Sequence, residues 1–367
     1  IFLFLTFKLS LSKSVINFLL LFLALLVSSL VSIISSGNYK SDFIIGVLKL
    51  GVIIFNSYSF AYLAINNFYI DEVKLLKIIV LFVFSIAIIS VYIFVNIDAQ
   101  IWVVNNSNIE VAKSAQYMAS RLVDLSIGGG TALSLVFLLG VVCIFELMKK
   151  GFYNFGNLLL LLMLTVVTFF SARTGFLFLL FVFVYYLKYF IALIRKNSTK
   201  ILIFSLLASV IFFQINYAYD LIDYELINVA FDAFVEIFII DSYSPGAGTT
   251  SSILINDHLK LDHNSIEFFL CKNNIEIDSD IAYIKLMYAG GLFSVLIFIF
   301  FWCYLFFSSV KNGESKNIVY ISFIFFALSV FFTNFKELLF FNARGILFIM
   351  LFLYFYIEIN KGCKNVY

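Results

Sequence analysis

The sequence has little of what soluble proteins and metal sites are made of. Only 13% of its 367 residues are charged, against about a quarter in soluble domains, and it has one proline and four cysteines. No CxxC or Cys/His spacing typical of zinc occurs, and the two histidines, His258 and His263, lack partner ligands. These absences exclude a disulfide scaffold and disfavour metal, cofactor or redox chemistry. A net charge of +2 gives no sign of nucleic-acid binding.

Long apolar runs make up most of the chain instead. Hydrophobic residues account for 63% of it, 48 residues are phenylalanine, and the mean hydropathy is +1.06. This composition indicates that lipid surrounds most side chains. Runs long enough for membrane-spanning helices occur at 14–34, 43–65, 75–95, 129–148, 156–172, 174–194, 201–217, 281–307, 318–333 and 343–358. We expect a single all-α polytopic membrane domain over residues 1–367, with about ten transmembrane helices.

One of these runs is too long for a single crossing. Residues 156–194 are almost uninterrupted apolar sequence, whereas about 20 residues cross a hydrocarbon core of about 30 Å. The small and polar residues Ser171-Ala-Arg-Thr-Gly175 interrupt this run. The sequence therefore predicts a tight helical hairpin at 171–175.

The basic residues predict the orientation of the helices, because lysine and arginine in short loops collect on the cytoplasmic side. If ten helices alternate, most basic residues fall on one side: Lys8, Lys13, Lys74, Lys77, Lys149, Lys150, Arg195, Lys196, Lys200, Lys311, Lys316, Lys361 and Lys364. We expect this side, with both termini, to be cytoplasmic. The other side then has two long loops, 96–128 and 218–280, and the second holds twelve of the 22 acidic residues. Helical spacing of acidic and apolar residues from 220 to 238 predicts an amphipathic helix at the outer interface.

Three of the four arginines depart from this pattern and fall on the outer side. Arg121 ends the first outer loop, Arg173 lies in the predicted hairpin, and Arg344 begins the last span. A guanidinium group binds phosphate well, because its planar fork donates two parallel hydrogen bonds. The three arginines suit a lipid diphosphate head group, although each also fits a role as a helix anchor. Residues 128–130, a glycine triplet, either begin a span flexibly or offer backbone N–H groups to an anion.

The second outer loop and the span after it supply candidates for acid–base and charge-binding roles. His263 precedes an apolar stretch and titrates near neutrality, so it suits a base that deprotonates a sugar hydroxyl. Asp280 is the second candidate, although a carboxylate at this position also caps a helix. Lys285 is a candidate substrate-binding residue, or it extends to the interface. A solvated acidic loop is the alternative for the whole set.

These residues resemble the Wzy-type O-antigen and capsule polymerases of bacterial inner membranes. The similarity lies in Ser171-Ala-Arg-Thr-Gly-Phe-Leu177 between two helices, in Asp278-Ser-Asp-Ile-Ala-Tyr-Ile284 with the glycine pair 290–291, and in the large outer loop before it. Length, phenylalanine richness and the expected topology fit as well. The resemblance covers most of the chain after about residue 115.

The resemblance implies a metal-independent glycosyltransferase of the cytoplasmic membrane whose active site faces the periplasm or exterior. Its substrates would be undecaprenyl-diphosphate-linked oligosaccharide repeat units, with surrounding membrane lipid and a chain-length regulator as further partners. Carried over by position, Arg173 and Arg121 would bind the diphosphate. The loop 218–280 departs from the family pattern because it contains no arginine. Either Lys260, Lys272, Lys285 or Arg344 substitutes there, or that part of the mechanism does not transfer.

Two other functions remain open on the sequence alone. An O-antigen ligase would transfer finished glycan to lipid A core, and His263-Asn264-Ser265 is similar to the outer-loop histidine region of such ligases. A flippase or transporter of lipid-linked sugars would line a path with polar residues at mid-membrane. The predicted spans contain few of these, Lys49 and Asn56 among them, which favours chemistry at the outer surface.

Overall fold

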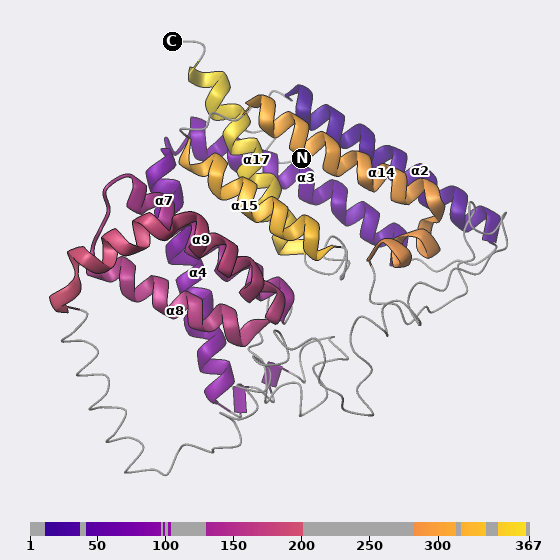
Figure 1. Cartoon of the computed structure of the whole chain (residues 1–367). Helices are drawn as coiled ribbons and strands as arrows, with labels where there is room; N and C mark the ends of the chain where they lie inside the picture. Colours follow the sequence, from indigo (N-terminus) through magenta and orange to yellow (C-terminus); the bar gives the residue numbers. More distant parts are fainter. Residues whose placement is uncertain are drawn as a thin grey trace.

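The computed structural model describes residues 12–36, 42–96, 98–99, 102–103, 130–200, 282–312, 317–334 and 344–364. Over these ranges the long elements are all α-helices (Figure 1): α2 Lys13–Ser36, α3 Asp42–Asn66, α4 Glu72–Val95, α7 Thr131–Lys149, α8 Phe155–Ser171, α9 Arg173–Lys196, α14 Ala282–Asn312, α15 Ile318–Thr333 and α17 Arg344–Lys364.

These helices lie at nine of the ten predicted spans. Six are long and apolar enough to cross a membrane, over Lys13–Val31, Ile44–Asn66, Glu72–Ile93, Thr131–Lys149, Gly175–Lys196 and Gly290–Lys311. Shorter apolar helices cover Phe155–Phe169 and Ile318–Thr333. The chain is therefore an α-helical polytopic membrane protein, and the total of ten spans stays a prediction. The predicted span at 201–217, most of the outer loop 96–128, and the loop 218–280 with its amphipathic helix lie outside the described residues.

Helix α7 is the centre of one group of helices. All its side chains from Thr131 to Met148 are buried, because α4, α8, α9 and α15 pack around it. At Gly140 a Cβ atom would lie only 2.7 Å from Val83 and 2.8 Å from Leu164. Glycine at this point lets α4 and α8 approach the central helix closely.

A second group consists of α2, α3, α14 and α17, and Figure 1 shows α14 lying along α2. Helix α15 contacts both α7 and α17 and so joins the two groups. In the second group the buried ring of Phe18 lies 5.2 Å from Phe301, 5.0 Å from Tyr304 and 5.4 Å from Tyr354, centroid to centroid. Such ring pairs contribute about 0.5–1.5 kcal/mol each beyond the area that they bury.

The lysine-bearing ends of α14, α17 and α4 lie at one end of the bundle. The Tyr356 hydroxyl near the end of α17 donates to the backbone oxygen of Ile70, in the turn between α3 and α4, at 2.8 Å. Lys361 Nζ donates to the backbone oxygen of Lys311, near the end of α14, at 2.9 Å. The turn 67–71 and the last turns of α14 and α17 are therefore neighbours.

The lysines of the α7 group reach the same end. Lys77 Nζ, in the first turns of α4, lies 4.4 Å from the ring centroid of Phe152, in the turn between α7 and α8. Lys196 Nζ, at the end of α9, lies 5.6 Å from the ring centroid of Tyr153 in that turn. We call this end the basic end. The assignment of this end to the cytoplasm remains a prediction from the sequence. Helices α7, α9 and α17 all begin at the opposite end of the bundle.

Candidate functional site

Three of the six predicted site residues lie within the described helices. Arg173 is the first residue of α9, Arg344 is the first residue of α17, and Lys285 lies in the first turn of α14. The remaining three, at positions 121, 263 and 280, lie outside the described residues. The structure therefore places three of the four cationic candidates in the fold, while Arg121 and the acid–base candidates stay predictions.

The predicted hairpin at 171–175 is confirmed. Helix α8 ends at Ser171, α9 begins at Arg173, and the single residue between them, Ala172, has extended backbone angles of φ −163° and ψ 146°. The last hydroxyls of α8 bond to carbonyls of their own helix: Ser171 Oγ to Val167 at 2.7 Å and Thr168 Oγ1 to Leu164 at 2.6 Å. Small polar side chains can thus be buried at this turn without losing hydrogen bonds.

A close contact fixes the start of α9 against the start of α7. At Gly175 a Cβ atom would lie 2.4 Å from Ser134 Cβ and 2.5 Å from Ser134 Oγ. Real Cβ atoms do not approach so closely, so only glycine allows this packing. Since Ser134 is in the first turn of α7 and Gly175 in the first turn of α9, the two helix N-termini lie side by side.

Neither of these N-termini has a side-chain cap among the described residues. The N-cap of α7 is Gly130, whose φ of 66° suits glycine, and the N-cap of α9 is Ala172; neither makes a side-chain cap hydrogen bond. The aligned peptide dipoles make a helix N-terminus attractive to anions. The two adjacent N-termini, one of them beginning with Arg173, lie beside the C-terminus of α8 at the end opposite the basic end.

The glycine pair 290–291 interrupts α14. Gly291 has φ 73° and ψ 173° inside the helix, which kinks there. The carbonyl of Gly290 accepts hydrogen bonds from Ser294 Oγ at 2.7 Å and from Ser28 Oγ of α2 at 3.2 Å. The kink is thus held by α2. Helix α14 packs on α2 and α17, whereas α9 packs on α7, α8 and α15, so Lys285 and Arg173 belong to different groups of helices.

The sequence reasoning missed a buried polar cluster near the basic end. Glu146 is fully buried in the last turn of α7, within the predicted span 129–148. Its Oε1 accepts hydrogen bonds from Lys149 Nζ at 2.7 Å and from the Tyr186 hydroxyl of α9. Its Oε2 has no hydrogen-bond partner among the described residues. The i, i+3 spacing of Glu146 and Lys149 could have revealed the ion pair, whereas Tyr186, forty residues away, could not be found.

The lysine of this cluster is enclosed by aromatic rings. Lys149 Nζ lies 5.2, 4.7 and 5.7 Å from the ring centroids of Tyr185, Tyr186 and Tyr189. Cation–π attraction and the carboxylate of Glu146 both compensate the loss of water around the ammonium group. Glu146 and Lys149 neutralise each other in the last turn of α7, so this cluster is not a polar path at mid-membrane.

The described residues give little support for a metal site. No group of three His, Cys, Asp or Glu side chains among them could hold a metal ion. Cys143 is buried, Cys303 is exposed, and both are free.

Comparison with known proteins identifies no relative of this chain. No protein-family model, curated protein or solved structure is significantly similar to this chain. The architecture therefore defines the class, a polytopic α-helical membrane protein, and the function must be inferred from the residues.

Proposed function

We propose that this chain is a glycosyltransferase that polymerises undecaprenyl-diphosphate-linked oligosaccharide repeat units on the outer face of the bacterial cytoplasmic membrane. Two kinds of observation support the proposal. The sequence around 171–177 and 278–291 resembles Wzy-type polymerases, and the fold has the helical membrane architecture that this resemblance implies.

The adjacent N-termini of α7 and α9 are the observation on which the proposal mainly rests. They are held together by the contact of Gly175 with Ser134, and Arg173 begins one of them. Helix N-termini and a guanidinium group both favour a bound diphosphate. They would be present before the substrate binds, so they need no reorganisation during the reaction.

The proposed reaction assigns a role to each group. A hydroxyl of the incoming repeat unit attacks the anomeric carbon that joins the growing chain to its lipid diphosphate. The new glycosidic bond forms as the bond to the diphosphate oxygen breaks, and undecaprenyl diphosphate leaves with the bonding electrons. Arg173 stabilises the negative charge of this leaving group, assisted by Arg121. His263 or Asp280 accepts the proton of the attacking hydroxyl.

Deletion of the gene in its host tests the function directly. We expect surface glycan to stop at one repeat unit, and the full ladder to return with the wild-type gene but not with Arg173→Ala at the same protein level. A persistent ladder in which all polymer stays on its lipid carrier would identify a ligase instead. Unchanged glycan in the deletion strain would remove the chain from polymer synthesis altogether.

A further inference from the structure

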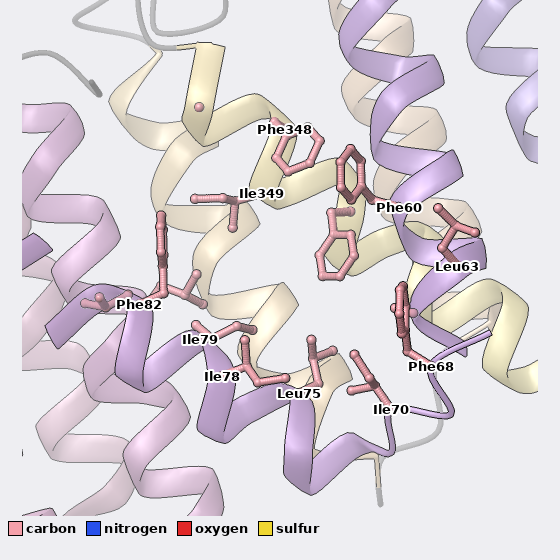
Figure 2. A pocket seen from close by; sticks show the side chains of 15 residues that line it. Phe60, Leu63, Phe68, Ile70, Leu75, Ile78, Ile79, Phe82, Phe348 and Ile349 are labelled. Atoms are coloured by element: carbon pink, nitrogen blue, oxygen red, sulfur yellow. The ribbon is translucent and has the colours of Figure 1, made fainter. Parts of the chain in front are cut away.

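The second group of helices meets its surroundings largely through apolar surfaces. An apolar groove of about 510 Å³ separates α3 from α4, with α17 along its third side, and all the side chains that line it are apolar (Figure 2). Lipid tails are as apolar as these side chains, so such a surface has no preference for one occupant. Polar groups buried between the helices are more informative, because each of them needs a partner.

One set of buried polar groups lies at the break in α14. Gly291 has φ 73° and ψ 173°, a combination that only glycine adopts without strain. We call residues 282–290, which precede the break, the short segment of α14. Figure 1 shows this segment turned away from the line of the rest of the helix.

The short segment is not needed to cross the membrane. The membrane-spanning part of α14 is Gly290–Lys311, which has 22 residues. At a rise of about 1.5 Å per residue this part is about 33 Å long, and a hydrocarbon core is about 30 Å thick. The direction of the short segment is therefore set by its contacts at the break and not by the need to span the bilayer.

Three oxygen atoms from two helices meet at the break. The Gly290 carbonyl accepts hydrogen bonds from Ser294 Oγ at 2.7 Å and from Ser28 Oγ of α2 at 3.2 Å. The two hydroxyl oxygens lie 2.9 Å apart, so the serines also bond to each other. Ser28 is 7% exposed and Ser294 is fully buried. Ser28 is the member of this cluster that comes from another helix.

The cluster couples the direction of the short segment to α2. A break in a helix disturbs its backbone hydrogen bonds, and within a membrane the protein itself must satisfy the groups concerned. The two serines do so for the Gly290 carbonyl. The predicted site residue Lys285 lies in the short segment, and Asp280 shortly precedes it in the sequence. The direction of the segment therefore decides where both residues are presented to a substrate.

We propose that Ser28 of α2 is a positioning residue for the start of α14. Through the Gly290 carbonyl and Ser294 it holds the short segment at its angle to the membrane span. Lys285 and the end of the loop 218–280 are thereby placed at the end of the bundle opposite the basic end. The inference rests on the proposed function only for its catalytic consequence, which is shorter polymer when the angle is lost.

The distance between two spin labels on the full chain in phospholipid nanodiscs measures this angle. In a cysteine-free background the labels are placed at Tyr283→Cys, in the short segment, and at Phe307→Cys, a position that is 76% exposed in the span. A straight helix would hold these two Cα atoms about 36 Å apart, at a rise of about 1.5 Å per residue. We expect a narrow distance distribution centred at least about 5 Å below that value, because the helix is broken between the labels.

Ser28→Ala removes the hydroxyl group that α2 contributes. We expect the distance distribution to become about twice as wide, because the short segment then takes a range of angles, and the glycan ladder to shift toward shorter polymer at matched protein levels. Gly291→Ala shows that the assay detects a change of angle: alanine does not tolerate the backbone angles at this position, so the mean distance should move at least about 3 Å toward that of a straight helix.

Ser29→Ala is the matched control. Ser29 is the next residue of α2 and is fully buried, but its hydroxyl donates to the carbonyl of Leu26 in its own helix at 2.7 Å. Its distance distribution should equal that of the unsubstituted chain. An unchanged distribution for Ser28→Ala, or equal broadening by Ser29→Ala, would overturn the positioning role, as would a straight-helix distance in the unsubstituted chain. Unchanged glycan in the deletion strain would remove the proposed function but leave these distances as the test of the positioning role, so either proposal can fail alone.

Discussion

Replacing Gly175 by alanine tests whether the contact between α7 and α9 is as close as the structure places it. The new methyl carbon would lie 2.4 Å from Ser134 Cβ, far inside the usual carbon–carbon separation of about 3.5–4.0 Å. Overpacking of this kind costs about 1–3 kcal/mol. Alanine regains up to about 1 kcal/mol of helix propensity, so we expect a net loss of about 1–2 kcal/mol in the free energy of unfolding.

Gly156→Ala provides the matched control, since Gly156 is also in the first turn of its helix. A Cβ atom there would have its nearest neighbour, Asn154 Oδ1, at 3.7 Å, which is an ordinary contact. This variant should be as stable as wild type or slightly more stable. Unfolding in mixed detergent micelles would measure both variants. A double-mutant cycle with Ser134→Gly should then show a coupling energy of about 1–2 kcal/mol. If Gly175→Ala is as stable as Gly156→Ala, the packing argument fails.

Two further predictions concern topology and the buried cluster. In a cysteine-free background, Ser244→Cys should react with a membrane-impermeant thiol reagent from outside intact cells and Ser315→Cys should not; the reverse result would invert the orientation. Lys149→Met should lower the free energy of unfolding by about 3–5 kcal/mol, because it leaves a buried carboxylate without its cation. Lys188→Met, at an exposed position on α9, should change it by about 0.5 kcal/mol at most, and equal effects would show that the buried ion pair does not stabilise the fold.

Much of the helical arrangement could be predicted because membrane helices follow simple length and charge rules. The hairpin at 171–175 was predicted from the length of the apolar run and from the small and polar residues that interrupt it, and the structure has the break at Ala172. The lysines at positions such as 77, 196 and 361 were expected on one side, and their helix ends do meet. Such features depend on short stretches of sequence, so no knowledge of packing was needed.

Features that depend on packing between distant segments could not be predicted. Glu146 was overlooked because the surrounding span is strongly apolar, and its partner Tyr186 comes from another helix. The groove beside α17 exists because α3 packs on α2 and α17 while α4 packs on α7 and α8. No local sequence pattern predicts these packing partners. The contact of Gly175 with Ser134 is of the same kind: the sequence showed a glycine at a turn but not what it touches.

The diphosphate role of Arg173 is the central claim, and Arg173→Lys tests it most directly. Lysine keeps the positive charge but loses the bidentate fork, so polymerisation should fall about tenfold or more, equivalent to roughly 1.4 kcal/mol in the barrier. Arg195→Lys, at the exposed far end of the same helix, should leave it unchanged. The measurement is the glycan ladder from membranes with matched protein levels. We predict a ladder reduced mainly to single repeat units for Arg173→Lys; a full-length ladder from this variant would contradict the account, because an arginine that only anchors a helix can be replaced by lysine.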